Sequence, residues 1–158
     1  MTLAPALTAA AALRDELQEE VGRSRDERLI LRSLDGPRIQ ARIDERLEFI
    51  TRAEELQRVL RVEQAAVARR LGLTDASATA IARRLPEGHR LVELIAQIGA
   101  LASTLSELGA LNQSLAERAL GCTRAFTRGL APKPAAYGRL GVVPPPAAAG
   151  LSAVSRRA

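Results

Sequence analysis

The sequence predicts an all-α protein, an elongated antiparallel three-helix bundle or coiled coil followed by a disordered C-terminal tail. Three observations lead to this fold class. Of the 158 residues 47% are hydrophobic, but there are only two Phe, one Tyr and no Trp, and such an aliphatic composition suits packed helices better than a sheet sandwich. Apolar residues recur three or four apart over long stretches, which is the helical period. Gly and Pro lie between these stretches, where helices would end.

The first two apolar series predict long amphipathic helices at residues 3–34 and 38–71. Between them, Asp35-Gly36-Pro37 interrupts the pattern, because Gly is a poor helix former and Pro disfavours a helical conformation in the residue before it. A kink within one helix and a true turn between two helices both remain open. The second helix is expected to end near Gly72.

A short helix is expected at residues 77–84, with Thr74 as its cap. From residue 90 to residue 130 the apolar positions alternate at spacings of three and four, as the a and d positions of a heptad seam do. The seam consists of Leu91, Leu94, Ile98, Leu101, Leu105, Leu108, Asn112, Leu115, Ala119, Cys122 and Phe126. An apolar seam of this length needs a partner, which we expect to be the second helix folded back antiparallel, with the first helix alongside.

The chain thus divides into a helical domain at residues 1–130 and a flexible tail rich in Pro, Ala and Arg at residues 131–158. The formal net charge is +5, and the tail holds four basic and no acidic side chains. In the helical body acidic and basic residues alternate, as at residues 42–48, which predicts solvated helix faces. We therefore expect no nucleic-acid partner, despite the basic pI.

Catalytic and metal-binding constellations are not recognisable in the sequence. The single His89 lies in a loop and the single Cys122 lies on the seam, so a metal site would lack ligands, and no cofactor or small-molecule substrate is expected. We therefore do not expect this protein to be an enzyme. One cysteine forms no internal disulfide, which fits a reducing cytoplasm. No stretch approaches the roughly 20 apolar residues that cross a bilayer, so we expect no membrane insertion.

An alternative function is that of a small DNA-binding regulator, because residues 64–85 resemble a helix-turn-helix motif. With Gln64 as the first position of the motif, the expected small, apolar and glycine positions are filled by Val67, Ala68, Leu71, Gly72, Leu73, Ala78 and Ile81. Any two amphipathic helices joined through Gly satisfy this pattern, and the second helix would offer Asp75 beside its few basic residues. An ordinary corner in a helical bundle is the favoured interpretation.

The polar member of the seam, Asn112, has two interpretations. An Asn at one a position fixes the register of packed helices, because its amide is left unpaired when the helices slip. Direct contact with a partner is the other. Asn112 lies in LNQSLAERALGCTRAF (111–126), which is followed by AAYGRLG (135–141).

These two segments resemble the C-terminal signature of FlgN-type flagellar chaperones, in which an N-x-x-L helix is followed by a Pro-containing stretch and a Tyr-x-x-x-Gly element. The matching residues are Asn112, Leu115, Leu120, Pro132, Tyr137 and Gly141. The resemblance implies a cytoplasmic chaperone that binds the terminal helices of the hook–filament junction proteins FlgK and FlgL and delivers them to the type III export gate. A homodimer is compatible with it.

The resemblance and the seam together place the partner-binding surface on the last helix. Terminal helices of polymerising subunits present apolar stripes, which a long helical seam can accept by helix-in-groove packing. The expected client-binding residues are Leu108, Leu111, Asn112, Leu115, Ala119 and Phe126. Tyr137, by resemblance, would dock at the export gate.

Overall fold

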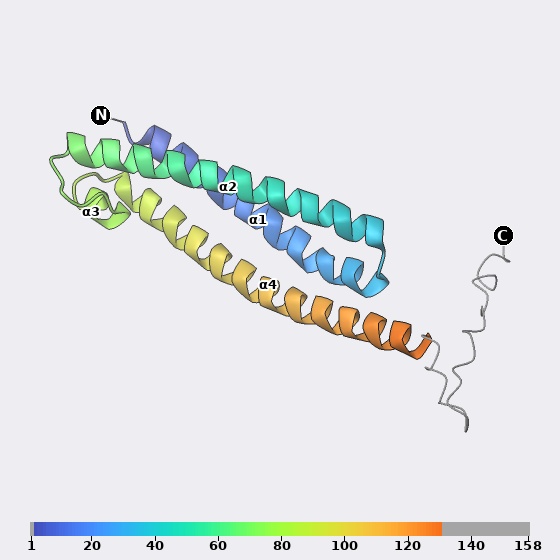
Figure 1. Ribbon diagram of the computed structural model, residues 1–158. Coiled ribbons are helices and arrows are strands. Elements are labelled where there is room, and N and C mark those ends of the chain that lie inside the picture. Colours follow the sequence, from blue (N-terminus) through green and yellow to red (C-terminus); the bar gives the residue numbers. More distant parts are fainter. Residues whose placement is uncertain (1, 131–158) are drawn as a thin grey trace, which may run out of the picture. The chain divides into compact units, whose positions relative to one another are not determined.

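The computed structural model describes residues 2–130, and this part of the chain contains four helices and no strand. The helices are α1 (Ala4–Ser33), α2 (Gly36–Arg70), α3 (Ala78–Ala82) and α4 (Gly88–Leu130) (Figure 1). The all-α class and the three long helices are confirmed. The chain divides into two compact units, Met1–Gly121 and Cys122–Ala158, and the described part of the second unit, residues 122–130, is helical. The expected tail at residues 131–158 lies outside the described residues.

A tight turn joins α1 to α2, so that the two form an antiparallel hairpin. Leu34 takes a left-handed conformation with φ of 53°, and Asp35 then caps α2 by accepting a hydrogen bond from the backbone N–H of Arg38 at 3.2 Å. Pro37 lies in the first turn of α2, where its missing N–H removes no hydrogen bond. The interruption in the sequence is therefore a turn, and the second helix begins two residues earlier than expected, at Gly36 rather than 38.

The corner between α2 and α4 differs in detail from its sequence prediction. Gly72 follows α2 with a positive φ of 66°, a conformation that suits glycine after a helix end. The short helix covers Ala78–Ala82 rather than 77–84, and Ser77 caps it in place of Thr74, accepting a hydrogen bond from the N–H of Ala80 at 3.2 Å. Ser77 is the better placed residue because it directly precedes the first helical residue.

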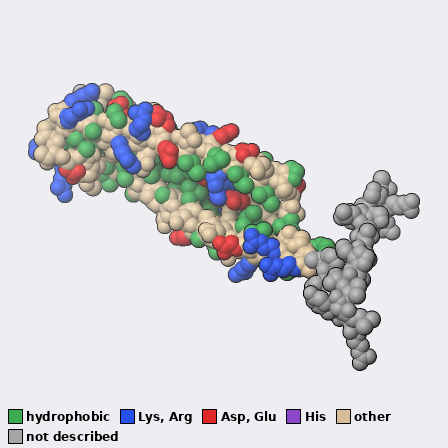
Figure 2. Space-filling model, in the orientation of Figure 1, with side chains coloured by type: hydrophobic (Ala, Val, Ile, Leu, Met, Phe, Trp, Pro, Cys, Tyr) green, Lys and Arg blue, Asp and Glu red, His purple; other side chains and the backbone are tan. Residues whose placement is uncertain are grey.

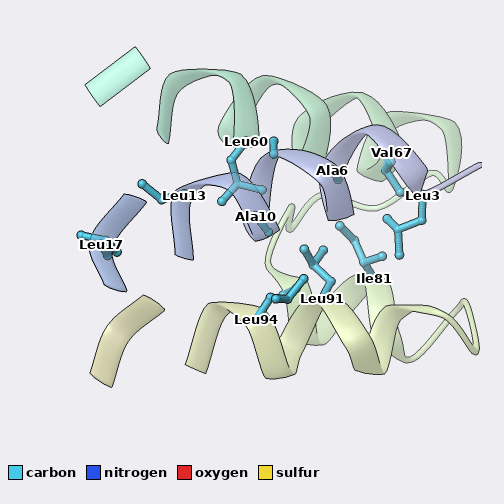
Figure 3. Packing of buried hydrophobic residues seen from close by; sticks show 12 residues of the cluster. Leu3, Ala6, Ala10, Leu13, Leu17, Leu60, Val67, Ile81, Leu91 and Leu94 are labelled. Carbon is cyan, nitrogen blue, oxygen red and sulfur yellow. The ribbon is translucent and has the colours of Figure 1, made fainter. Parts of the chain in front are cut away.

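The hydrophobic core joins all four helices at the end of the bundle where α3 lies (Figure 3). Its largest fully buried members are Leu3, Ile81 and Leu91. Figure 3 shows Leu91 and Leu94 pointing from α4 toward the alanines of α1, and Leu60 of α2 close to Ala10. Burying one such leucine stabilises the fold by about 1.5–3 kcal/mol. The small alanine side chains let α1 lie close to its neighbours, since interhelical distance depends on the side chains at the contact.

Helices α1 and α4 run parallel in a fixed register. Leu3 and Leu91 share the core cluster, and Asn112 forms a hydrogen bond with Ser24, which is 88 residues earlier in the chain. Leu3 and Leu91 are also 88 residues apart, since 91 − 3 = 88. A constant offset over about six helical turns is what two parallel helices of equal rise produce. The seam of α4 thus contacts α1 through the buried Asn112.

By length and composition, helix α4 is also long and apolar enough to cross a membrane. Its most apolar stretch has a mean hydropathy of 1.4, and 11% of that stretch is buried inside the protein. This corrects the expectation that no stretch approaches such a length. The seam accounts for part of this apolar character, because Leu91 and Leu94 are buried against the rest of the core. A single helix that passes this test is weak evidence for a membrane span, since core helices of water-soluble proteins pass it as well.

Candidate partner-binding groove

A cluster of polar side chains is buried between α1, α2 and α4. Glu20 and Ser24 of α1 are 1% and 0% exposed, and Arg42 of α2 is 5% exposed. Arg42 donates a hydrogen bond to the Glu20 carboxylate, and Arg23 donates another from Nε at 2.9 Å. The Ser24 hydroxyl donates to the same carboxylate at 3.3 Å. The buried polar cluster, as we call it below, comprises Glu20, Ser24, Glu27, Arg42, Arg46 and Asn112.

Glu20 stays ionised in this setting. Burial raises the pKa of its carboxyl group, but the hydrogen bonds and charges of Arg42 and Arg23 lower it by more. The net result is a pKa below the ordinary value of 4.5. At neutral pH the cluster therefore holds a buried carboxylate that its arginine partners neutralise.

Two further side chains extend the cluster toward the α1–α2 turn. Arg46 Nη2 lies 3.0 Å from Glu27 Oε2, and Arg42 Nε lies 3.4 Å from the same oxygen. Arg42 was expected on a solvated face among alternating charges, and this expectation is wrong. Its guanidinium instead joins α2 to α1 through the carboxylates of Glu20 and Glu27, which lie 22 and 15 residues earlier in the sequence.

A sequence signal for the cluster exists on α1. The apolar series of this helix contains Leu13, Leu17 and the buried Val21, and its next member is Leu31. Polar residues occupy the positions that continue the spacing of Leu13 and Leu17 at four and three, namely Glu20, Ser24 and Glu27. Three polar side chains in the register of a buried stripe indicate a buried polar layer, provided that a second helix supplies partners.

Asn112 connects α4 to this cluster. Its side chain is 2% exposed, and Nδ2 donates a hydrogen bond to the backbone carbonyl of Ser24 at 2.8 Å. Its Oδ1 accepts no hydrogen bond from the residues that the structure describes. The contact supports the interpretation of Asn112 as a register residue, because sliding α4 along α1 would leave a buried amide without its partner.

Next to the cluster, the three long helices enclose an apolar pocket of about 210 Å³. Ile30 and Leu31 of α1, Ile39 and Ile43 of α2 and Ala116 of α4 line it, and Glu27, Arg42 and Arg46 of the cluster complete its wall. The charged groups of that wall face one another within 3.4 Å, so the pocket offers a mainly apolar surface.

An exposed apolar stripe on α2 extends from this pocket. Ile43, Leu47 and Ile50 are 48%, 59% and 42% exposed. Their spacings of four and three place them on one face of the helix. Figure 2 shows hydrophobic side chains gathered on the surface between α2 and α4. We refer to the pocket together with this stripe as the groove.

The sequence did not predict this exposed stripe, because the second apolar series was assigned to one buried face. In the structure the core face of α2 is a different one, formed by Phe49, Ala53, Leu56, Leu60 and Val67. The signal was present in the spacing. Successive residues of a helix are rotated by about 100°, so the series of Ile43, Leu47 and Ile50 and the series of Phe49, Ala53 and Leu56 occupy different faces.

The expected client-binding residues of α4 fall into different environments. Leu108 and Asn112 are buried at 8% and 2% exposure, whereas Leu111 and Phe126 are exposed at 57% and 68%. The remaining two in the described range, Leu115 and Ala119, are half-buried. Tyr137 lies outside the described residues. The structure therefore does not bring these residues together on one open surface.

The structure gives less support for a metal site or a DNA-binding site. Within residues 2–130, no group of three or more His, Cys, Asp or Glu side chains could hold a metal ion. The segment considered as a DNA-binding motif contains α3, which is only five residues long and has Ala78 and Ile81 buried in the core. A recognition helix reads base edges with exposed side chains along its length in the major groove. This corner therefore fits a structural role better than a DNA-binding one.

Comparison with protein families decides the class of the protein. The family model of the FlgN protein matches residues 3–144, which include all four helices and both segments that carry the sequence signature. The chain belongs to the FlgN family. Searches of curated proteins and of solved structures give no match. FlgN proteins are chaperones of flagellum biogenesis, and this family is not known for enzymatic activity.

Proposed function

We propose that this FlgN family member binds the terminal helices of the hook–filament junction proteins FlgK and FlgL in the cytoplasm, prevents their premature assembly and delivers them to the type III export gate. Family membership supports the chaperone role. One observation supports the mode of binding: Ile43, Leu47 and Ile50 stay exposed beside the apolar pocket in the folded chain.

The groove suits an amphipathic helix. Its stripe offers apolar side chains at helical spacing, and a client helix that presents its own stripe would cover them by helix-in-groove packing. A contiguous exposed apolar surface on a folded protein commonly marks an interaction site. The charges in the pocket wall are paired with one another, so an apolar client side chain would not leave a single charge without a partner.

Helix α4 contributes to the proposed site in two ways. Asn112 holds α4 against α1 through its hydrogen bond to Ser24 and so fixes the wall that α4 gives to the groove, and Leu108, one turn earlier, is buried as well. The more accessible members, Leu111, Leu115, Ala119 and Phe126, would contact the client directly. Tyr137, proposed for the export gate, would act separately from client binding.

Calorimetric titration of the full chain with FlgK and FlgL C-terminal segments tests client binding. Leu47→Asp places a charge in the exposed stripe, and we expect it to weaken binding at least tenfold, because the aspartate would lose water on contact with the client. The matched control is Leu29→Asp, since Leu29 is similarly exposed at 65% but lies on α1 and does not line the pocket. Equal affinity of both variants, or no binding by the wild type, would contradict the proposed site.

Tyr137→Ala tests delivery. We expect this variant to bind the client segments with wild-type affinity and to reduce export of the client from cells, because an aromatic side chain can anchor a small interface. Pull-down of the chain with the gate's cytoplasmic domain measures the step directly. Normal capture and normal export with this variant would remove Tyr137 from the proposal without affecting the groove.

A further inference from the structure

The end of α4 combines exposed apolar side chains with uniformly positive charge. Every residue from Leu120 to Leu130 is exposed, and Phe126 and Leu130 are each 68% exposed. We call residues 118–130 the terminal segment of α4. It contains no Asp or Glu, and its charged residues are Arg118, Arg124 and Arg128. Figure 2 shows basic side chains gathered at this end of α4.

The basic and the apolar residues of the terminal segment lie on opposite sides of the helix. Successive residues are rotated by about 100°, so the three arginines fall within an arc of about 120°. Phe126 and Leu130 are about 40° apart on the opposite side, and Leu120 borders that side. A short helix with arginines on one side and Phe or Leu on the other is typical of helices that lie in the surface of a membrane.

The charge of the chain changes character where the terminal segment begins. Residues 1–117 carry 16 basic and 18 acidic side chains, a net charge of −2, whereas residues 118–158 carry seven basic and no acidic ones. The net charge of +5 therefore comes entirely from the C-terminal part of the sequence. Such an asymmetry within one chain indicates that this part meets an anionic surface.

We propose that the terminal segment of α4 binds the surface of a membrane that contains anionic lipids. Each arginine near such a surface strengthens binding about fivefold. Phe126 and Leu130 enter the boundary between the headgroups and the acyl chains. The 13 residues of the segment extend about 20 Å, less than the roughly 30 Å of the hydrocarbon core, so the segment lies along the surface and does not cross the bilayer.

A membrane surface suits this segment better than a partner helix or a nucleic acid does. Residues 122–130, the described part of the second unit, form a single helix, which offers no groove for a partner helix. A nucleic acid would contact the arginines, but binding of single strands relies on stacking against several aromatic side chains, and the segment has one, Phe126. A membrane surface uses both sides of the helix at once.

Membrane binding is independent of the proposed client binding. Leu130 and the three arginines of the terminal segment are not among the residues proposed to contact the client. Variants at these positions therefore test the membrane contact alone. Phe126, which we proposed as a client contact, is left unchanged in every variant.

Flotation of the full chain with lipid vesicles tests the proposal. The wild type should float with vesicles of equal parts phosphatidylglycerol and phosphatidylcholine, and should bind at least tenfold more weakly to phosphatidylcholine alone. Added salt should weaken the binding, because it screens the arginines. Leu130→Asp should bind the anionic vesicles at least tenfold more weakly, because it places an acid in the apolar side of the segment. Leu29→Asp is the matched control, since Leu29 is 65% exposed on α1, and it should bind as the wild type does.

A triple variant tests the contribution of the arginines. It carries Arg118→Gln, Arg124→Gln and Arg128→Gln. Binding to the anionic vesicles should weaken at least tenfold, because each arginine contributes about fivefold. The matched control removes the same charge from exposed positions of α2, with Arg61→Gln, Arg69→Gln and Arg70→Gln. This control should bind nearly as the wild type does. Circular dichroism verifies that all variants keep their helices.

Cys122 reports which side of the helix enters the membrane. It is the single cysteine of the chain, it is exposed, and it lies about 40° from Phe126 around the helix axis. A fluorophore attached to Cys122 should be quenched by anionic vesicles whose acyl chains carry bromine. In the double variant Cys122→Ser with Ala125→Cys, the fluorophore lies among the arginines, since Ala125 falls between Arg118 and Arg128 around the axis, and quenching should be weak.

Four outcomes would overturn the proposal. They are a wild type that leaves anionic vesicles unbound, binding by Leu130→Asp or by the arginine variant that equals that of the wild type, equal quenching at the two labelled positions, and a mobility shift of an RNA duplex without any binding to vesicles. The last would assign the arginines to nucleic acid instead. Each of these outcomes is compatible with normal client binding at the groove, so failure of membrane binding is distinguishable from failure of the proposed function.

Discussion

Replacing Arg42 with alanine removes the cation closest to the most buried carboxylate of the protein. Loss of one partner from a buried ion pair costs about 3–5 kcal/mol, because the other charge stays in a site of low polarity. Here Glu20 keeps Arg23 Nε at 2.9 Å and Arg46 Nε at 3.6 Å. Because these two cations partly replace the lost one, we expect a cost near the lower end, about 3 kcal/mol. That is a large share of the roughly 5–15 kcal/mol that stabilise a typical domain.

Urea unfolding followed by the helical circular dichroism signal at neutral pH measures this loss. Replacing both Glu20 and Arg42 with leucine should recover most of the stability, because it removes the unpaired charge together with its partner. Arg52→Ala is the control: Arg52 forms a 2.9 Å ion pair with Glu16 but is 48% exposed, so the unfolding midpoint should hardly move. A loss below about 1 kcal/mol for Arg42→Ala would refute the buried pair as described.

Four further predictions concern single positions. The folded state lowers the pKa of Glu20, so the contribution of Glu20 to stability is complete above the unfolded pKa of 4.5 and is lost as the pH falls through the lower folded value. The unfolding free energy of Glu20→Gln, measured across this range, should therefore depend less on pH than that of the wild type. Gly88→Ala should destabilise the fold by about 1–3 kcal/mol in urea melts, because the added Cβ would lie 2.4 Å from a backbone atom of α3. Gly99 has free space around it, so Gly99→Ala should instead stabilise α4 by up to about 1 kcal/mol. Asn112→Ala should cost about 1–3 kcal/mol in the same assay, and an unchanged melt would contradict its role in register. Leu115→Ala should cost about 1–2 kcal/mol, less than the 2–5 kcal/mol of a fully buried leucine, and should weaken client binding in calorimetric titration; normal binding would exclude it from the site.

The helices were predictable because their signals are local. The spacing of apolar residues predicted α1, α2 and α4 within a few residues, and Gly and Pro marked the breaks. The boundaries shifted where a competing local rule applied. Pro37 was taken to precede α2, although proline is well suited to the first turn of a helix. Family signature residues on α4 then indicated the chaperone class, which the family match confirmed.

The site was harder to predict, because burial depends on how each helix is rotated toward its neighbours. Ile43 and Leu56 belong to the same apolar series of the sequence, yet one is exposed and the other packs against the core. Likewise, Leu108 and Leu111 were assigned to one surface, and the structure buries the first and exposes the second. Spacing along one helix gives the relative angle between side chains but not the direction in which the partner helix lies.

The buried polar cluster supplies that missing direction for α2. Arg42 and Ile43 are neighbours in sequence and therefore about 100° apart around the helix axis. With Arg42 turned inward to Glu20, the stripe that begins at Ile43 remains outside the core and beside α4. Rotating α2 so that Ile43 faced inward would turn Leu60 and Val67, which lie on the same face as Arg42, away from the core. The ion pair between Arg42 and Glu20 opposes this rotation. The rotation would leave Glu20 without its closest cation in a site from which water is largely excluded. The cluster thus favours one rotation of α2, and this rotation keeps the groove open for another helix.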